Sequence, residues 1–307
     1  MQSSKLIKTL EFKNAKHKAQ WASTLETYAY PVIGNLGVDT IRRSHILAIL
    51  NPIWTTKTET ASRLRGRIEK VLDWCEAAGH RSDELKNPAM LKGNLSVLLP
   101  SPSKIKEVTN MPSVPYQDIG KFVKKLRTYN ESTAHAVEFL LLTATRPNEV
   151  RFMEWDDVDL EKKIWRIPAS KYKTNKPHTV ALNTRAIEIL RDRKKYDSKL
   201  CFPSPLHMDK TMSDSTKSKF MHNNMGYKEV PHGFRATFRT WSHEETSFPM
   251  EVIEGAMGHR IADKSSSSYI RGDQLKKRFK LMEAWLNYIE LNMNPKNKVT
   301  SIRKNSA

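Results

Sequence analysis

The first third of the chain repeats its apolar residues with the period of an α-helix. Between residues 14 and 96, apolar side chains recur at steps of three and four positions. One such face holds Trp21, Leu25 and Ala29, and no stretch of this region shows the period of two that marks a strand. The pattern predicts an all-α bundle of about four helices over residues 1–97.

This pattern ends at a proline-rich segment. Residues 98–115 contain Pro100, Pro102, Pro112 and Pro115, with serines between them. Proline lacks an amide N–H and its ring blocks the interior of a helix. The segment is therefore expected to be a linker between two domains.

Residues 116–292 combine helical faces with two strand-like segments. Alternation at 163–167 and 178–182 predicts two strands, and the polar residues 171–177 between them predict a hairpin loop. Helical spacing predicts the remaining elements, at residues 119–126, 133–145, 184–195, 233–247, 249–257 and 273–291. The fold class is thus two-domain, with an all-α bundle followed by a mainly-α α+β domain that has a small β-hairpin or sheet. The basic tail, residues 293–307, is expected to be disordered.

Charge narrows the class of partner. The 307 residues include 52 Lys and Arg against 33 Asp and Glu, a net charge of +19 that is spread along the whole chain. Such an excess predicts binding to a polyanion, and two basic domains on a tether could close around a DNA duplex. A membrane surface is the weaker alternative, because neither end of the chain shows a strongly amphipathic basic helix.

Composition also indicates the compartment. The longest apolar stretch, residues 136–144, is interrupted by Glu138 and is too short to span a bilayer. The N-terminus shows no apolar segment of the kind that a signal peptide needs. Cys75 and Cys201, in unrelated contexts, are typical of a reduced cytoplasmic protein without disulfides.

Candidate chemistry comes from five side chains that are scattered along the second domain. Arg146, His232, Arg235, His259 and Tyr269 supply two guanidiniums, two imidazoles and a phenol. Cleavage of a phosphodiester by a tyrosine, without metal, needs cations for the phosphate oxygens, a proton donor and a polarised hydroxyl. Each residue alone also has an ordinary interpretation, as a helix cap, a surface cation or a packing residue.

Local sequence predicts where three of these residues lie. Arg146 precedes Pro147, which disfavours helix at Arg146, so we expect a turn there with Glu149 three residues further on. His232 and Arg235 stand three apart at the start of a helix, where they could share a face and point at one anion.

The order and spacing of these residues resemble the tyrosine recombinases, or phage integrases. That family's pattern is an arginine after an apolar helix, a hairpin lysine, His-x-x-Arg, Gly-His, and a tyrosine about ten residues further. The segments Asn14–His17, Thr27–Pro31, Ile53–Lys57, Phe234–Trp241 and Tyr269–Asp273 resemble the P4-like integrases of prophages and genomic islands, which are mobile genetic elements. This likeness runs from about residue 14 to about residue 290.

The resemblance implies a role for each side chain. Tyr269 would attack a DNA phosphate, leaving a 3′-phosphotyrosyl bond and a free 5′-hydroxyl. Arg146 and Arg235 would hold the nonbridging oxygens, His232 would assist the proton at the nucleophile, and His259 would donate a hydrogen bond to the phosphate. These four residues with Tyr269 and a hairpin lysine form the expected catalytic set.

Two further positions complete that expected site. Three lysines lie in the hairpin loop, Lys171, Lys173 and Lys176, and Lys173 matches the family pattern best as the residue that protonates the 5′-oxygen. Glu149 would support Arg146. No metal and no cofactor is expected, because the covalent link conserves the phosphodiester energy.

The implied partner is double-stranded DNA at attachment core sites. The resemblance implies a protein that is a monomer when free and a homotetramer on DNA, with excisionase or DNA-bending host proteins as further partners. The apolar stripe of the helix at 273–291 is expected to pack on its own domain, although a C-terminal segment exchanges between protomers in the family.

The origin of the short N-terminus and two rival functions remain open. P4-like integrases carry an N-terminal domain that binds arm-type sites, and only thirteen residues precede the matching region here. The chain is therefore expected to be a short integrase, a fragment or the product of a late start. A type IB topoisomerase shares the chemistry, and a DNA-binding remnant that no longer recombines is the other rival.

Overall fold

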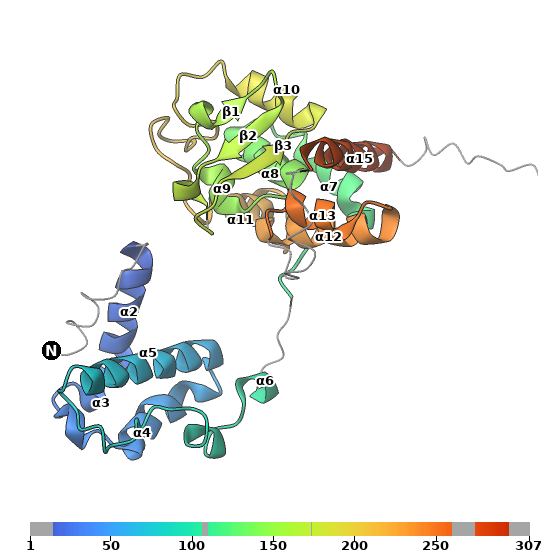
Figure 1. Cartoon of the computed structure of the whole chain (residues 1–307). Coiled ribbons are helices and arrows are strands. Elements are labelled where there is room, and N and C mark those ends of the chain that lie inside the picture. Colours follow the sequence, from blue (N-terminus) through green and yellow to red (C-terminus); the bar gives the residue numbers. More distant parts are fainter. Residues whose placement is uncertain (1–14, 106–109, 173, 260–273, 295–307) are drawn as a thin grey trace, which may run out of the picture. The chain divides into compact units, whose positions relative to one another are not determined.

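The chain forms two compact units, Met1–Thr109 and Asn110–Ala307 (Figure 1). The computed structural model describes residues 15–105, 110–172, 174–259 and 274–294, and the structural statements below concern these residues. The boundary falls inside the proline-rich segment 98–115. Tyr269, Lys173 and the tail after residue 294 lie outside the described residues.

The first unit is built from helices, as its periodicity predicts. Its core joins the predicted faces, with Trp21, Leu25, Leu50, Leu64 and Leu72 all buried. The helical elements are α2 (Ala15–Tyr28), α3 (Tyr30–Ile33), α4 (Arg43–Trp54), α5 (Thr58–Ala77) and α6 (Pro102–Ile105), with a 3-10 turn at Leu95–Val97. The all-α part of the predicted fold class is thereby confirmed.

Both ends of the proline-rich segment pack against a unit. Leu99 is buried in the first core, and the Trp54 indole N–H donates to the Pro100 carbonyl at 2.9 Å. Val114 is buried in the second core, and the Val230 N–H donates to the Pro112 carbonyl at 3.1 Å. The prolines thus mark where the chain leaves one unit and enters the next.

The second unit surrounds α8 (Ser132–Thr143), whose residues are nearly all buried, including Glu138. A helix that is apolar on every face belongs at the centre of a domain. The other helices are α7 (Ile119–Leu126), α9 (Pro147–Arg151), α10 (Thr184–Arg193), α11 (Thr216–Lys219), α12 (Phe234–Glu245), α13 (Met250–Ala256) and α15 (Leu275–Met293), with a π-helical turn at Phe220–Asn224.

A small antiparallel sheet lies on the same unit (Figure 1). Its strands are β1 (Val158–Asp159), β2 (Ile164–Ile167) and β3 (His178–Ala181), in the order β1-β2-β3. The predicted hairpin is β2–β3, in which Ile167 pairs with His178. β1 was not predicted, because two residues are too few to show alternation.

The last helix, α15, packs within its own unit. Trp285 and Ile289 are buried, and the Trp285 indole N–H donates to the Leu141 carbonyl of α8 at 3.1 Å. At the far end, a Cβ on Gly120 of α7 would lie 2.2 Å from the backbone of Asn292. Only glycine permits this approach, so α7 and α15 touch backbone to backbone.

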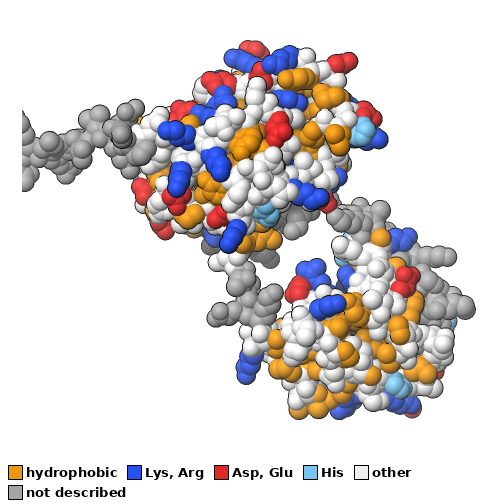
Figure 2. Space-filling view, turned by 180° about the vertical axis from the view of Figure 1, so that it is seen from behind, with side chains coloured by type: hydrophobic (Ala, Val, Ile, Leu, Met, Phe, Trp, Pro, Cys, Tyr) orange, Lys and Arg blue, Asp and Glu red, His pale blue; other side chains and the backbone are white. Residues whose placement is uncertain are grey.

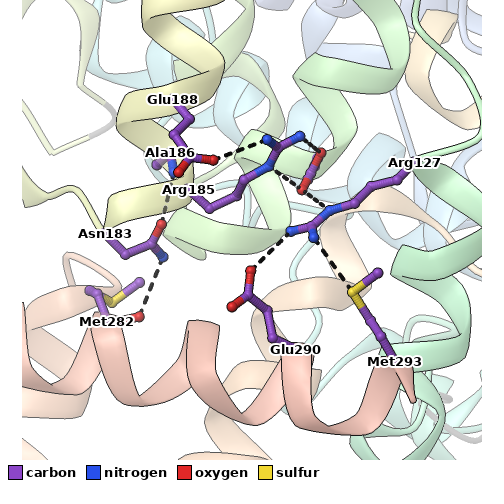
Figure 3. A network of polar contacts seen from close by, with 9 residues as sticks. Arg127, Asn183, Arg185, Ala186, Glu188, Met282, Glu290 and Met293 are labelled. Carbon is purple, nitrogen blue, oxygen red and sulfur yellow. Dashed lines mark hydrogen bonds and ion pairs between the residues drawn. The ribbon is translucent and has the colours of Figure 1, made fainter.

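A set of charged residues connects the end of α7 with α8, α10 and α15, and we call it the structural cluster: Arg127, Glu138, Arg185, Glu188 and Glu290 (Figure 3). Glu138 of α8 is 2% exposed; it accepts from Arg127 Nε at 2.7 Å and from Arg185 Nε at 3.0 Å. Arg185 also pairs with Glu188 at 3.1 Å, and Arg127 with Glu290 of α15 at 3.7 Å. Each cation of this cluster therefore faces carboxylates.

Lysine and arginine side chains are spread over the face of each unit seen in Figure 2, with acidic side chains among them. In the part of the chain that the structure describes, no helix has both the length and the apolar character needed to cross a membrane.

Candidate active site

Arg146 lies in the turn between α8 and α9, where the following proline places it. Ala144 ends α8 with φ +49°, and Arg146 is extended, with ψ +146°, before Pro147 begins α9. Glu149 accepts two hydrogen bonds from Arg146, from its backbone N–H and from Nη1, each at 2.7 Å. The carboxylate thus holds both the backbone and the guanidinium of Arg146.

The environment of Arg146 keeps it charged. Burial lowers the pKa of this guanidinium, but contacts with Glu149 and Tyr172 outweigh burial and leave the pKa above its ordinary value. The guanidinium also lies over the Tyr172 ring, 5.1 Å from the ring centroid. A carboxylate and an aromatic face therefore hold this cation together.

Arg235, in the first turn of α12, is a buried cation with only 6% of its surface exposed. Its Nη1 donates to the Ala144 carbonyl at 2.6 Å, its Nη2 donates to the Met257 carbonyl at 3.0 Å, and Nη2 also contacts Nε2 of His259. Among the described residues, no carboxylate lies within ion-pair distance of Arg235. Burial, and then the nearby charge of Arg146, lower the pKa of Arg235 to about 10.

His259 follows a tight turn at Gly258, whose φ is +65°. The turn brings Nδ1 of His259 back to the carboxylate of Glu254 on α13, which also accepts from Arg239 Nε at 2.8 Å. Because carboxylates accept and guanidiniums donate, the proton lies on Nδ1 while Nε2 accepts from Arg235. Arg239 therefore pairs with Glu254, whereas Arg235 is held by a separate set of acceptors.

Glu254 is ionised in this arrangement. Burial raises the pKa of its carboxyl, but the hydrogen bond from His259 and the charge of Arg239 outweigh burial and leave the pKa below its ordinary value. The carboxylate orients the His259 ring as acidic partners orient histidines at many catalytic sites.

The hairpin between β2 and β3 reaches this site through Tyr172. The phenol is 5% exposed, and its hydroxyl donates to the Gly258 carbonyl at 2.8 Å. Lys171 turns away and pairs with Asp157 at 2.7 Å and with Glu154 at 3.0 Å, whereas Lys176 is exposed. Two carboxylates therefore already neutralise Lys171.

His232 lies on a 3-10 turn, Pro231–Gly233, directly before α12. Its side chain is exposed, whereas that of Arg235 is buried, so the two residues differ in environment despite their helical spacing. A Cβ on Gly233 would lie 2.4 Å from the Pro112 carbonyl. The segment around Pro112, where the chain enters this unit, therefore packs closely against the turn that carries His232.

The structure brings Arg146, Glu149, Arg235 and His259 into one site, which we call the site cluster together with Glu254. Sequence reasoning missed Glu254 and Tyr172. Glu254 lies five residues before His259, and only the positive φ of Gly258 brings the two together. Tyr172, between two lysines, has the sequence context of a solvent-facing loop.

The donors of this site fit an oxyanion and not a metal ion. The Arg235 guanidinium contacts the His259 imidazole, and the charge of Arg146 is near enough to lower the pKa of Arg235. No group of three or more metal-ligating side chains occurs among residues 15–105, 110–172, 174–259 and 274–294. A buried guanidinium that neutral acceptors hold in place, as Arg235 is, can stabilise charge on phosphate oxygens.

Comparison with known sequences identifies the family. The chain matches the phage integrase central domain over residues 5–94 and the phage integrase family over residues 112–274. The second match alone covers more than half of the chain, and this chain therefore belongs to the phage integrase family.

Two individual relatives match most of this chain at low sequence identity. Prophage integrase IntA of Escherichia coli K12 is 29% identical over 88% of this chain, and the integrase of enterobacteria phage P4 is 27% identical over 91%. The chain spans 64% and 66% of the lengths of these two relatives.

Solved structures share the fold. Lambda integrase (residues 75–356), solved as a dimer bound to a COC′ core site, matches with a TM-score of 0.63 at 15% identity over 88% of this chain and 93% of that one. The same integrase as a tetramer bound to a Holliday junction gives a TM-score of 0.64 at 15% identity, over 89% of this chain and 76% of that one. The predicted fold class is confirmed.

Proposed function

We propose that this chain is a site-specific DNA recombinase, which cleaves and rejoins DNA through a 3′-phosphotyrosyl intermediate. The observation that carries the proposal is Arg235, a buried guanidinium whose acceptors among the described residues are all neutral. Leaving a buried cation without a counter-ion is costly unless a ligand supplies one. A phosphodiester supplies that charge, and membership of the phage integrase family makes DNA its source.

The chemistry follows from the positions of the site groups. Arg146 and Arg235 would bind the nonbridging oxygens and stabilise the pentacoordinate transition state. A phosphate that takes the Arg235 Nη2–H group would leave Nε2 of His259 facing it. That nitrogen donates to the phosphate once it takes a proton, and Glu254 would stabilise the resulting imidazolium.

The remaining groups would act on the attacking oxygen and the leaving oxygen. Tyr269 would attack the phosphorus, with His232 assisting removal of the phenolic proton. Lys173 would protonate the departing 5′-oxygen, a role for which Lys171 is poorly placed because Asp157 and Glu154 already pair with it. Rejoining would reverse these steps with a new 5′-hydroxyl.

The proposed partner is double-stranded DNA that carries an attachment core site. The unit Met1–Thr109 would bind the core-type site, and Asn110–Ala307 would cut it. Support for assembly on DNA comes from lambda integrase, which was solved as a dimer and as a tetramer on DNA. We propose a homotetramer on two duplexes, acting in the bacterial cytoplasm.

A suicide substrate tests the proposal. Nicked duplexes from the attachment repeats that flank the coding region lose a short strand after cleavage, which traps the covalent protein–DNA adduct. Wild-type protein should give this adduct, and Tyr269→Phe should abolish it because the nucleophile is gone. Tyr196→Phe, at an exposed tyrosine, is the matched control and should leave it unchanged. Absence of any adduct with wild-type protein would refute the proposed reaction.

Binding to the same duplexes gives a second test. If many lysine and arginine side chains neutralise phosphates, the dissociation constant should rise steeply with salt, because released counterions favour the free state at high salt. A fluorescence-anisotropy titration at several salt concentrations measures the slope. Affinity that does not change with salt would contradict the proposal that the protein encloses DNA through many phosphate contacts.

A further inference from the structure

Tyr172 is the one tyrosine whose contacts join three parts of the described site. It lies in the loop between β2 and β3, yet its phenol is 5% exposed, while its neighbour Lys171 is held by Asp157 and Glu154. A buried side chain has little freedom to move, and the ion pairs of the preceding residue restrict it further.

The hydroxyl of Tyr172 fits the turn that precedes His259. It donates to the Gly258 carbonyl at 2.8 Å, and a Cβ on Gly258 would lie 1.8 Å from the same oxygen. Gly258 therefore needs to be glycine twice over, for its φ of +65° and for its contact with the phenol. The turn that aims His259 is shaped around Tyr172.

The ring of Tyr172 supports the other side of the site. The Arg146 guanidinium lies 5.1 Å from the ring centroid, and the His178 ring of β3 lies 5.2 Å from it at an interplanar angle of 31°. Together with the Glu149 carboxylate, the ring leaves Arg146 few alternative orientations. One side chain thus contacts both the Arg146 turn and the Gly258–His259 turn.

We propose that Tyr172 is a positioning residue for strand cleavage, which fixes the Arg146 guanidinium and the Gly258–His259 turn relative to each other. This inference rests on the proposed function, because it assigns Tyr172 to that reaction. Tyr172 itself transfers no proton and forms no bond to DNA. It acts by keeping two groups that contact the phosphate at a fixed separation.

Two variants separate the two contacts. Tyr172→Phe removes the hydrogen bond to Gly258 and keeps the ring beneath Arg146, so single-turnover cleavage of the nicked suicide duplex should slow about tenfold. Tyr172→Leu removes both contacts and should slow cleavage about a hundredfold, the effect of a small misplacement of catalytic groups. The dissociation constant for the duplex should change less than about twofold, because phosphate contacts across the whole DNA surface dominate it.

Matched controls guard against a simple folding defect. Tyr196→Phe and Tyr196→Leu alter an exposed tyrosine of the same unit and should cleave like wild-type protein. Thermal unfolding identifies any variant that fails to fold, and the conservative Tyr172→Phe keeps the inference testable if Tyr172→Leu does.

A methylphosphonate at the scissile position provides the decisive readout. This substitution removes the negative charge that Arg146 would stabilise, so cleavage should depend less on how that guanidinium is held. The Tyr172→Leu deficit should then shrink at least tenfold, in parallel with that of Arg146→Ala. A deficit of equal size on both substrates, or cleavage at the wild-type rate by both Tyr172 variants, would overturn the inference and leave the proposed function standing. Failure of wild-type protein to form any adduct would overturn both.

Discussion

Arg235 differs in its surroundings from two other arginines of the second unit, Arg127 and Arg185. In the structural cluster, Arg127 and Arg185 share the buried Glu138, and each has a second carboxylate, Glu290 or Glu188 (Figure 3). In the site cluster, Arg146 pairs with Glu149, but Arg235, which is more deeply buried than Arg127 or Arg185, meets two backbone carbonyls and an imidazole. Arg127 and Arg185 are therefore neutralised within the fold, whereas no carboxylate among the described residues pairs with Arg235.

The difference separates cations that carboxylates of the fold neutralise from a cation that a bound anion would neutralise. Pairing of a buried charge with opposite charges limits its desolvation penalty, and neutral acceptors do so only in part. The site cluster therefore contributes less to folding than its many hydrogen bonds suggest, and binding of a phosphate would supply the missing charge. Substitutions in the two groups should consequently affect different measurements.

The largest expected effect is on stability, at Glu138. Glu138→Gln removes a buried negative charge that pairs with both Arg127 and Arg185. The free energy of unfolding should therefore fall by about 3–5 kcal/mol. Chemical denaturation of the second unit measures this change. Glu188→Gln removes an exposed partner of Arg185 and should cost at most about 1 kcal/mol. If the two variants unfold alike, the buried charge of Glu138 stabilises the fold no more than the exposed charge of Glu188 does.

The next largest effect is on cleavage, at Arg235. Arg235→Gln keeps a hydrogen-bond donor and removes the charge, so the rate of adduct formation should fall about 10²–10³-fold, as expected for a lost transition-state donor. The free energy of unfolding should not fall, because an unneutralised buried cation has been removed. Stability curves and adduct assays on one preparation give both values. A large loss of stability would place Arg235 with the structural cluster.

His178 lies near three cations of the second unit. Burial, with the charges of Arg278, Arg146 and Arg235, lowers the pKa of His178 from its ordinary 6.5 to about 4. Between these values the unfolded chain binds a proton that the folded chain refuses, so stability is complete above the ordinary pKa and falls as pH drops toward 4. Between about pH 7 and pH 5 the loss from this residue should be on the order of 2 kcal/mol.

Comparison with a variant isolates that contribution. His178→Gln cannot take up a proton, so its free energy of unfolding should depend less on pH than that of wild-type protein over the same range. Denaturation curves at a series of pH values measure the difference. Parallel curves for the two proteins would mean that the site tolerates another cation.

The smallest expected effect is at Glu254. This residue contacts His259 and is not expected to contact the phosphate itself. Glu254→Gln weakens a charged hydrogen bond to Nδ1, and cleavage should slow about tenfold. Glu59→Gln, which breaks an exposed ion pair with Arg63 in the first unit, is the control and should have no effect. Equal rates for both variants would show that the ring of His259 needs no carboxylate.

Much of the fold could be predicted from local sequence, since its signals are local. The apolar period predicted the helices of both units, and Pro147 predicted the turn at Arg146. β1 and α11 were not predicted because elements of two and four residues are too short for a period to appear. The π-helical turn after α11 has no known sequence pattern that would have indicated it.

The site was only partly predictable, for a different reason. Arg146, Arg235 and His259 were selected by residue type and spacing, and the structure brings them together. Tyr172 and Glu254 depend on contacts between segments far apart in sequence, or on the positive φ of Gly258, and single-residue patterns carry neither. The roles of Tyr269 and Lys173 stay predictions, because both residues lie outside the described part of the chain.

The left-handed conformation of Ala144 has a consequence for how the two arginines respond to change. Its carbonyl anchors Arg235, and Arg146 follows two residues later, so one backbone position sets the place of both guanidiniums. A shift there would displace both cations in concert, and substitutions of Arg146 and Arg235 should therefore combine non-additively in a double-mutant cycle.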